Sequence, residues 1–156
     1  AAGGKDRARA ELLSRFANWH DPIARVIEAT PEEAIIRTDI SDRDPAPRWS
    51  RGRVTLLGDA AHPMTPNLGQ GGCQAIEDAV VLDLCLESHS NVEAAFEDYE
   101  ARRFARTARV VEEARRFGRI GQIESSPLRF LRDFALRATP NGLTLRSIRW
   151  LYDFDV

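Results

Sequence analysis

One stretch, residues 53–72, restricts the possible folds of this chain more than any other part of the sequence. It reads RVTLLGDAAHPMTPNLGQGG. Its apolar start predicts a strand that is covered on both faces, and Asp59 follows this strand at its carboxyl end. Pro63 and Pro66 fix two φ angles in the loop beyond it. The stretch therefore predicts a rigid loop next to an acidic side chain, an arrangement typical of a ligand site.

The segment after the loop predicts a helix whose N-terminus faces the same place. Cys73–Glu87 is apolar nearly all round, which is typical of a buried helix. Gly69, Gly71 and Gly72 allow the backbone to come close to a flat ligand. The unpaired N–H groups of the first helical turn carry about half a positive charge. The ligand is therefore expected to be anionic on this side.

Two kinds of anion suit such a helix start. Phosphate is one, but the sequence has neither the phosphate-loop signature with Lys-Ser/Thr after the glycines nor a GxGxxG fingerprint. A delocalised anion, such as the N1–C2=O edge of a reduced flavin, is the other.

The strands that this stretch needs as neighbours are scarce in the sequence. Besides Val54–Leu57, only Ala34–Ile40 is β-branched and partly alternating, and Ser41–Arg48 between them reads as a loop. Two strands do not form a stable sheet. We therefore expect partner strands outside this chain.

The rest of the chain is predicted to be helical. The expected helices are Lys5–Trp19, Pro22–Ala29 with Asp21 as N-cap, Val92–Arg119 with Asn91 as N-cap, Ser126–Ala138 and Leu143–Tyr152. Leu128, Leu131 and Phe134 are expected to be buried, and Trp150, Tyr152 and Phe154 to form an aromatic cluster.

Charged side chains on these helices have simple structural interpretations. The early position of Glu77 and Asp78 in their helix suits the helix dipole. The arginine-rich Val92–Arg119 reads chiefly as a solvated outer face, with an anion- or partner-binding stripe as the alternative. Ion pairs are expected between Asp98 and Arg102 and between residues 112 and 116.

Composition excludes several classes of protein. The net charge of −2 argues against a nucleic-acid surface, and no apolar run is long enough for a transmembrane helix. Cys73 and Cys85 lie roughly 18 Å apart on one predicted helix, so we expect free thiols and a cytoplasmic location. No histidine spacing supports a metal site.

The motif at residues 54–79 resembles the second flavin-binding motif of the FAD-dependent aromatic hydroxylases. These are the para-hydroxybenzoate hydroxylase-like, single-component flavoprotein monooxygenases. The spelling Pro-Asn-Leu-Gly-Gln-Gly-Gly-Cys is similar to the branch that contains salicylate hydroxylase, urate hydroxylase and zeaxanthin epoxidase. The resemblance implies an oxidoreductase with an α/β, Rossmann-like parent fold. Of that fold this chain would be a mostly α-helical C-terminal fragment with about two strands.

The resemblance also implies roles for residues of the motif. Asp59, after Gly58, would accept a hydrogen bond from a ribityl hydroxyl of FAD. Pro66 would lie on the C4a side of the flavin, where oxygen is activated, and is the one catalytic candidate. The amides near the pyrimidine edge would be those of Leu68, Gly69, Gln70, Gly71 and Gly72.

In such enzymes NAD(P)H reduces the flavin, and a C4a-hydroperoxide passes oxygen from O₂ to the substrate. The substrate would be an aromatic or related organic molecule that is hydroxylated or epoxidised. The cofactor supplies the difficult chemistry, in keeping with a motif that has no evident nucleophile or acid–base pair.

Large parts of a complete family member are missing from the sequence, notably the N-terminal dinucleotide fingerprint and the middle Asp-Gly motif. Residues 1–156 are therefore expected to be one C-terminal fragment of the FAD-binding domain, with a remnant of the substrate-domain sheet at 34–41. Its partner would be the N-terminal half of the same polypeptide. Alone, the fragment is expected to be inactive and to bind FAD weakly or not at all.

Alternatives remain at this stage. The parent protein could be a flavin-dependent reductase or dehydrogenase, such as a geranylgeranyl reductase-like protein. The fragment could also be a non-catalytic module that pairs with a separate N-terminal half. Asp59 could be a plain helix cap, and His62 is interpreted as a loop residue hydrogen-bonded to backbone rather than as a base.

Overall fold

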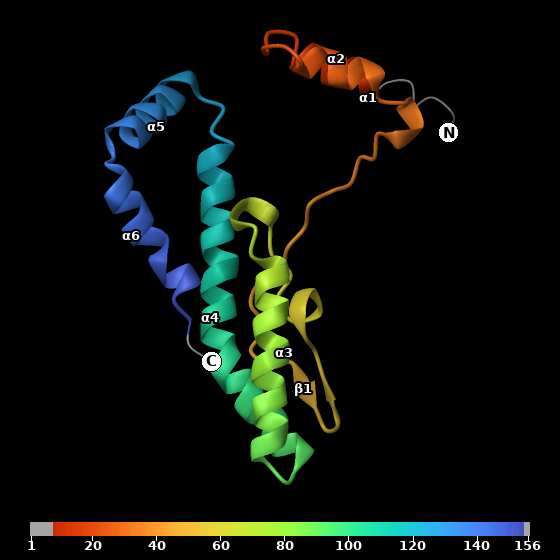
Figure 1. The fold of residues 1–156 in the computed structure, drawn as a ribbon, viewed down its shortest axis with the longest axis vertical. Helices are drawn as coiled ribbons and strands as arrows, with labels where there is room; N and C mark the ends of the chain where they lie inside the picture. The colour runs from red at the N-terminus through yellow and green to blue at the C-terminus, as the bar shows by residue number, and fades with distance from the viewer. Residues whose placement is uncertain (1–7, 155–156) are drawn as a thin grey trace. The chain divides into compact units, whose positions relative to one another are not determined.

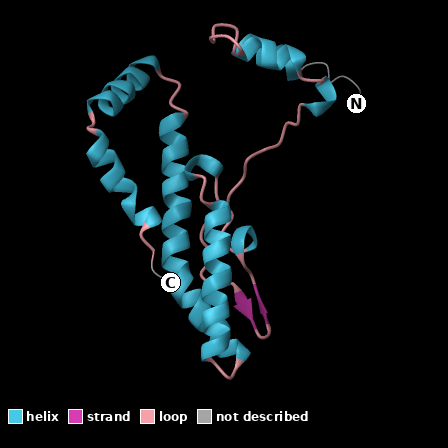
Figure 2. Ribbon diagram, in the orientation of Figure 1, coloured by secondary structure: helices cyan, strands magenta, loops and turns pink. Residues whose placement is uncertain are grey.

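The computed structural model describes residues 8–154, which are mostly helical (Figures 1 and 2). The chain forms two compact units, of which one ends at Ile40 and the other begins at Ser41. None of the helices within residues 8–154 has both the length and the apolar character that a bilayer span requires. The cytoplasmic location stays a prediction.

The N-terminal unit consists of α1 (Ala8–Arg15), α2 (Ile23–Ala29) and the 3₁₀ turn η1 (Glu32–Ala34). The first helix is shorter than the predicted Lys5–Trp19, whose residues 5–7 lie outside the described part. α2 begins after Pro22, which occupies the N-cap position without a side-chain cap bond. The prediction that Asp21 caps this helix is therefore wrong.

The predicted strand Ala34–Ile40 is also wrong. Residues 35–40 have no secondary structure, and Ile36 is 82% exposed. A strand needs a neighbour to pair with, and the part of the chain that the structure describes supplies none here. The β-branched sequence alone does not fold this segment.

The C-terminal unit starts with a small hairpin of β1 (Ser50–Arg51) and β2 (Val54–Thr55). The strands are antiparallel, and Gly52 turns the chain between them at a φ of 56°. The predicted buried strand Val54–Leu57 is thus only two residues long, and Val54 is 67% exposed. The number of strands matches the expectation for this fragment, and β2 lies within the predicted strand. β1 lies where no strand is predicted, and the burial of β2 differs from the prediction.

Two long helices, α3 (Gly71–Ser88) and α4 (Val92–Gly121), form the centre of this unit and lie side by side (Figure 1). Asn91 caps α4 as predicted, because its Oδ1 accepts hydrogen bonds from the amides of Glu93 and Ala94. The core between the helices and the hairpin contains Trp49, Ala61, Val81, Cys85, Ala95 and Tyr99.

The ion pairs on the outer face of α4 follow the prediction in part. Arg102 binds Asp98 with both Nε and Nη2, at 3.0 and 2.8 Å. Arg116, however, pairs with Glu113 and not with the predicted Glu112.

α3 is buried on one face only, contrary to the prediction that it is covered all round. The four buried side chains are those of Gln74, Asp78, Val81 and Cys85. On the other face Ile76 is 68% exposed, and Val80 and Leu84 are also exposed. α4 covers the buried face, and the described residues offer no element that covers the rest.

Two further helices, α5 (Ser126–Ala138) and α6 (Asn141–Tyr152), complete the chain. Leu128, Leu131 and Phe134 are exposed, so the prediction that they are buried is wrong. The predicted aromatic cluster is replaced by contacts with arginines: Arg109 lies 3.8 Å from the Trp150 ring centroid, and Phe154 faces two other arginines. Tyr152 is exposed.

Candidate functional site

The turn that carries Asp59 packs against α3. It is the 3₁₀ turn η2 (Gly58–Ala60). Gly58 has a φ of 59°, and a Cβ atom on it would lie 3.1 Å from the Cβ of Ala75. Because only glycine combines this backbone conformation with so close a contact, the turn lies directly on the helix.

Asp59 is exposed and lies near the first residue of α3. A Cβ atom on Gly71 would be 3.6 Å from the Asp59 Oδ1. Gln70, the buried N-cap residue of α3, makes no side-chain cap bond. The first amides of the helix therefore receive no hydrogen-bond acceptor from the N-cap side chain, and a carboxylate oxygen lies close to Gly71.

The loop between Asp59 and α3 is fixed to α4. Its 3₁₀ turn η3 (Pro66–Leu68) ends at Gly69, which has a left-handed φ of 64°. The Asn67 Nδ2 donates to the carbonyl of Ala114 at 3.1 Å. Gly118 makes this approach possible, since a Cβ there would lie 2.4 Å from that Nδ2.

The remaining predicted residues are distributed along this loop. Pro66, Gly69 and Gly72 are exposed, Leu68 and Gly71 are half-buried, and Gln70 and Gly58 are buried. The structure therefore brings Asp59 to the start of α3. The loop that precedes α3 is bound to the side of α4 through Asn67.

Beneath the turn lies a fully buried carboxylate. Asp78 Oδ2 accepts hydrogen bonds from the Gly58 amide at 2.9 Å and from His62 Nε2 at 2.6 Å. Its Oδ1 accepts from Arg103 Nε at 2.7 Å. Asp78 thus joins η2, α3 and α4 through one side chain.

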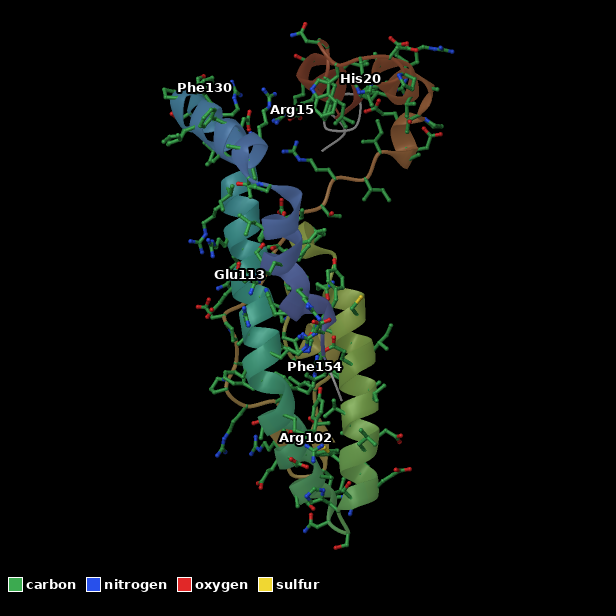
Figure 3. All side chains as sticks on the ribbon, turned by 60° about the vertical axis from the view of Figure 1, so that its left-hand side comes forward. Arg15, His20, Arg102, Glu113, Phe130 and Phe154 are labelled. Carbon is green, nitrogen blue, oxygen red and sulfur yellow. The ribbon has the colours of Figure 1, made fainter. Side chains whose placement is uncertain are left out.

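Arg103 extends this network along α3. Its side chain is 0% exposed and also donates to Gln74 Oε1 at 2.8 Å and to Glu77 Oε2 at 2.6 Å. Arg106 binds both Glu77 oxygens at 2.7 Å. The ring of Phe154, labelled in Figure 3, lies against both arginines, 5.2 and 4.2 Å from their guanidinium carbons.

The network keeps both acids ionised. Burial by itself raises the pKa of Asp78, but hydrogen bonds from His62, Arg103 and the Gly58 amide outweigh it and hold the pKa below its usual value. Burial likewise raises the pKa of Glu77, and Arg106 and Arg103 reverse the effect. The negative charges of the two carboxylates are therefore balanced by the positive charges of the two guanidinium groups.

This network is what the sequence interpretation missed. The half-buried Glu77 and the buried Asp78 accept hydrogen bonds from arginines rather than serving only as acids favoured by the helix dipole. Arg103 does not belong to a solvated face. His62 is 2% exposed and binds a carboxylate, not backbone. The available signal was a pair of adjacent acids within an otherwise apolar helix, because buried acids require cationic partners.

A cavity of about 700 Å³ lies on the other side of η3, between α4 and the last two helices. Leu68, Glu113 (labelled in Figure 3), Phe117, Arg132 and Trp150 contribute to its lining. Within the described residues, no group of three His, Cys, Asp or Glu side chains could hold a metal ion.

Comparison with known proteins places the chain in a family. The sequence model described as "FAD binding domain" matches residues 23–114, which is more than half of the chain. The chain belongs to this FAD-binding family. The family and the fold class that the motif predicts are therefore confirmed. FAD, the cofactor that the resemblance implies, is confirmed as well.

Several curated relatives are monooxygenases, hydroxylases or epoxidases by name. Aurachin C monooxygenase/isomerase of Stigmatella aurantiaca is 59% identical over 106 residues, which are 67% of this chain and 28% of that protein. FAD-dependent urate hydroxylase of Klebsiella pneumoniae subsp. pneumoniae is 44% identical over 110 residues, 70% of this chain and 29% of that protein. Chloroplastic zeaxanthin epoxidase of Solanum lycopersicum is 51% identical over 98 residues, 61% of this chain and 15% of that protein.

The fold has a close counterpart among solved structures. The crystal structure of Klebsiella pneumoniae HpxO complexed with FAD and uric acid matches with a TM-score of 0.83 and 36% identity. The match covers 95% of this chain and 38% of that one. This chain therefore spans well under half the length of the relatives that it matches.

Proposed function

We propose that this chain is the C-terminal part of a flavin-dependent monooxygenase and supplies one wall of its FAD site. The observation that carries the proposal is the placement of Asp59 beside Gly71, at a helix start without a side-chain cap. A hydroxyl-rich, partly anionic ligand is the partner that such a pair of groups can satisfy together. Membership of an FAD-binding family supports FAD as that ligand.

The residues of the chain fit this cofactor. The Asp59 carboxylate is exposed and can accept hydrogen bonds from ribityl hydroxyls. The amides of Leu68 to Gly72 lead into the positive end of α3, which favours negative charge at the pyrimidine edge. Gly71 leaves room that a Cβ atom would fill. Pro66, exposed at the start of η3, is proposed to face the side of the flavin where O₂ reacts.

The flavin, when bound, supplies the redox chemistry, and this chain positions it. We propose NAD(P)H as the reductant, O₂ as the oxidant and an aromatic or related small organic molecule as the substrate. The names of three relatives support an oxygen-inserting reaction rather than a simple reduction. The domain assignment, with residues 34–41 as a remnant of a substrate-domain sheet, belongs to the same proposal.

The exposed apolar surfaces support an N-terminal half as partner. Ile76, Val80 and Leu84 form an uncovered face of α3, and the hairpin residue Val54 is also exposed. Burying such side chains stabilises by about 25 cal/mol for each Å² removed from water. The relatives are more than twice as long as this chain, so their additional residues are suitable to cover these surfaces.

The test uses the complete polypeptide that contains this sequence. We expect it to purify with FAD and to consume O₂ with NAD(P)H while it oxygenates a substrate. Asp59→Ala should weaken FAD binding by about tenfold, equivalent to one lost charge-assisted hydrogen bond of roughly 1.4 kcal/mol. Asp83→Ala, at an exposed position of α3, is the matched control and should bind FAD normally.

Two results would contradict the proposal. A complete polypeptide without FAD affinity would exclude the flavin site. Steady NAD(P)H oxidation with a bound flavin, but without incorporation of oxygen from labelled O₂ into any aromatic or isoprenoid candidate substrate, would instead favour a reductase or dehydrogenase.

A further inference from the structure

The buried network reaches from the Asp59 turn to the end of α6. Asp78 holds the Gly58 amide, and Arg103 binds Asp78 and Glu77. Arg106 then connects Glu77 to the carbonyls of Trp150 and Leu151, at 3.1 and 2.9 Å. Side chains from α3 and α4 therefore link two segments that are far apart in the sequence.

We propose that Arg103 is a positioning residue for the flavin, acting through Asp78 and Gln74 rather than by contact with the cofactor. It sets the Asp59 turn and the start of α3 in a fixed relation to one another. The inference rests on the proposed FAD site, and it assigns to the buried ion pairs a role beyond holding two helices together.

The first half of this role concerns the turn. Asp78 Oδ2 binds the Gly58 amide and His62, which lie on either side of Asp59. One carboxylate oxygen below the turn therefore helps to fix the position of the Asp59 backbone. Arg103 Nε holds the other oxygen of that carboxylate at 2.7 Å and so fixes its rotation.

The second half concerns the helix start. Arg103 Nη2 donates to both the side-chain oxygen and the backbone carbonyl of Gln74, at 2.8 and 3.3 Å. The amide of Gln74 in turn closes the first turn of α3 by donating to the carbonyl of Gln70 at 2.8 Å. The Arg103 guanidinium group therefore contacts Asp78, which holds the Asp59 turn, and also Gln74, which lies in the first turn of α3.

The geometry of the guanidinium group is essential to this arrangement. Three different nitrogens of Arg103 serve Asp78, Glu77 and Gln74. A lysine carries the same charge on a single nitrogen and cannot reproduce this fork. The site thus depends on shape as well as on charge, which makes Arg103→Lys an informative variant.

The experiment compares Arg103→Lys with Arg102→Lys in the complete polypeptide. Arg102 is the adjacent residue (labelled in Figure 3); it is exposed and forms an ion pair with Asp98 on its own helix, α4. We expect Arg103→Lys to weaken FAD binding by about tenfold or more and to shift the absorption and circular dichroism bands of bound flavin. Arg102→Lys should change neither the affinity nor the spectrum.

A merely structural role has a different signature. It would lower the melting temperature and the folded fraction, but the folded molecules would bind FAD with the original affinity and spectrum. That result for Arg103→Lys would overturn the proposal. If Arg103→Lys does not fold, His62→Ala decides, since it removes a hydrogen-bond donor to Asp78. We expect affinity to fall by about threefold, and an unchanged affinity and spectrum would overturn the proposal.

Hydrogen exchange of the Gly58 amide separates this inference from the proposed function. The exchange should be faster in the variant than in the parent protein, even without FAD, because Asp78 is no longer held. Unchanged exchange would refute the positioning role. A parent protein that binds no FAD at all would refute the proposed function and, with it, the positioning of a flavin. A parent protein that binds FAD but shows unchanged Gly58 exchange in the variant would refute the positioning role alone.

Discussion

At the scale of single residues, the decisive side chain is Asp78. A carboxylate without exposure to water is unfavourable unless hydrogen bonds and opposite charge compensate for lost hydration. Asp78 has an amide, an imidazole and a guanidinium group as donors. Its neighbour in sequence, Glu77, is shared between two arginines. Removal of one member leaves the others buried with unbalanced charge.

Replacing Asp78 should therefore be costly. We expect Asp78→Asn to lower the free energy of unfolding by about 3–5 kcal/mol, the usual effect of breaking a buried ion pair. The NH₂ group of the new asparagine would also face the hydrogen-bond donors that now bind Asp78, so at least one of them would lose its acceptor. Urea denaturation measures the change, and Asp83→Asn at an exposed position of the same helix should stay within about 0.5 kcal/mol. Equal effects of the two substitutions would argue against the network.

Stability should also depend on pH in the acid range. The folded-state pKa values of Asp78 and Glu77 lie below their usual values of 3.8 and 4.5. The unfolded chain therefore takes up protons first as the pH falls. These two groups contribute their full stabilisation above about pH 4.5 and lose it progressively as the pH falls further. Unfolding free energies measured from neutral pH downward should show this fall, and Glu77→Gln should make it shallower.

At the scale of elements, the position of the loop depends on two helices. α3 receives the Asp59 turn through the close contact at Gly58, and α4 receives η3 through the contact between Asn67 and Gly118. Both contacts occur at glycines because a Cβ atom would displace the neighbouring element. The loop is therefore held by backbone-level packing at both of its ends.

Gly118→Ala should alter the loop without much change in overall stability. The substitution favours the helix by about 1 kcal/mol, but it displaces Asn67 and breaks a hydrogen bond worth a similar amount. These effects nearly cancel in the free energy of unfolding. The loop itself should loosen, and amide exchange at Gly69, which donates to the carbonyl of Pro66 at 3.0 Å, should accelerate.

Gly121→Ala provides the comparison. It lies in the same helix, and its Cβ would have no neighbour within 4 Å. We expect this variant to gain up to about 1 kcal/mol from helix propensity and to leave exchange at Gly69 unchanged. Faster exchange in both variants would mean that the contact with Asn67 does not hold the loop.

At the scale of the whole molecule, the chain is a set of ordered helices with uncovered apolar surface. Leu128, Leu131 and Phe134 on α5 are exposed, as are Ile76 and Val80 on α3. Contiguous exposed apolar surface usually marks an interaction site. The short span of the chain relative to its relatives gives the simplest reason for it.

The chain alone should therefore bind FAD poorly. We expect that titration of FAD into residues 1–156 leaves the flavin spectrum unchanged, because only one wall of the proposed site belongs to this chain. A tightly bound, stoichiometric yellow complex would contradict this. The complete polypeptide, treated in the same way, is the positive control.

The local elements were predictable where the signal was local. The α4 helix, its Asn91 cap and the Asp98–Arg102 ion pair follow from residues within one or two helical turns of one another. The start of α3 after Gly69 followed from proline and glycine positions. That residues 34–40 form no strand was not predictable from their sequence, since pairing depends on neighbours that the described part of the chain does not contain.

For the candidate site, the sequence by itself determined the motif, the family and the presence of an acid ahead of a glycine-led helix. These depend on the order and type of residues in one continuous stretch. Only the tertiary structure decided that Arg103 reaches Asp78 across 25 residues of sequence and that His62 binds a carboxylate. It also decided which face of each helix is covered. Such contacts depend on how two helices pack, and a one-dimensional pattern of apolar and charged residues does not specify which charged groups meet in the core.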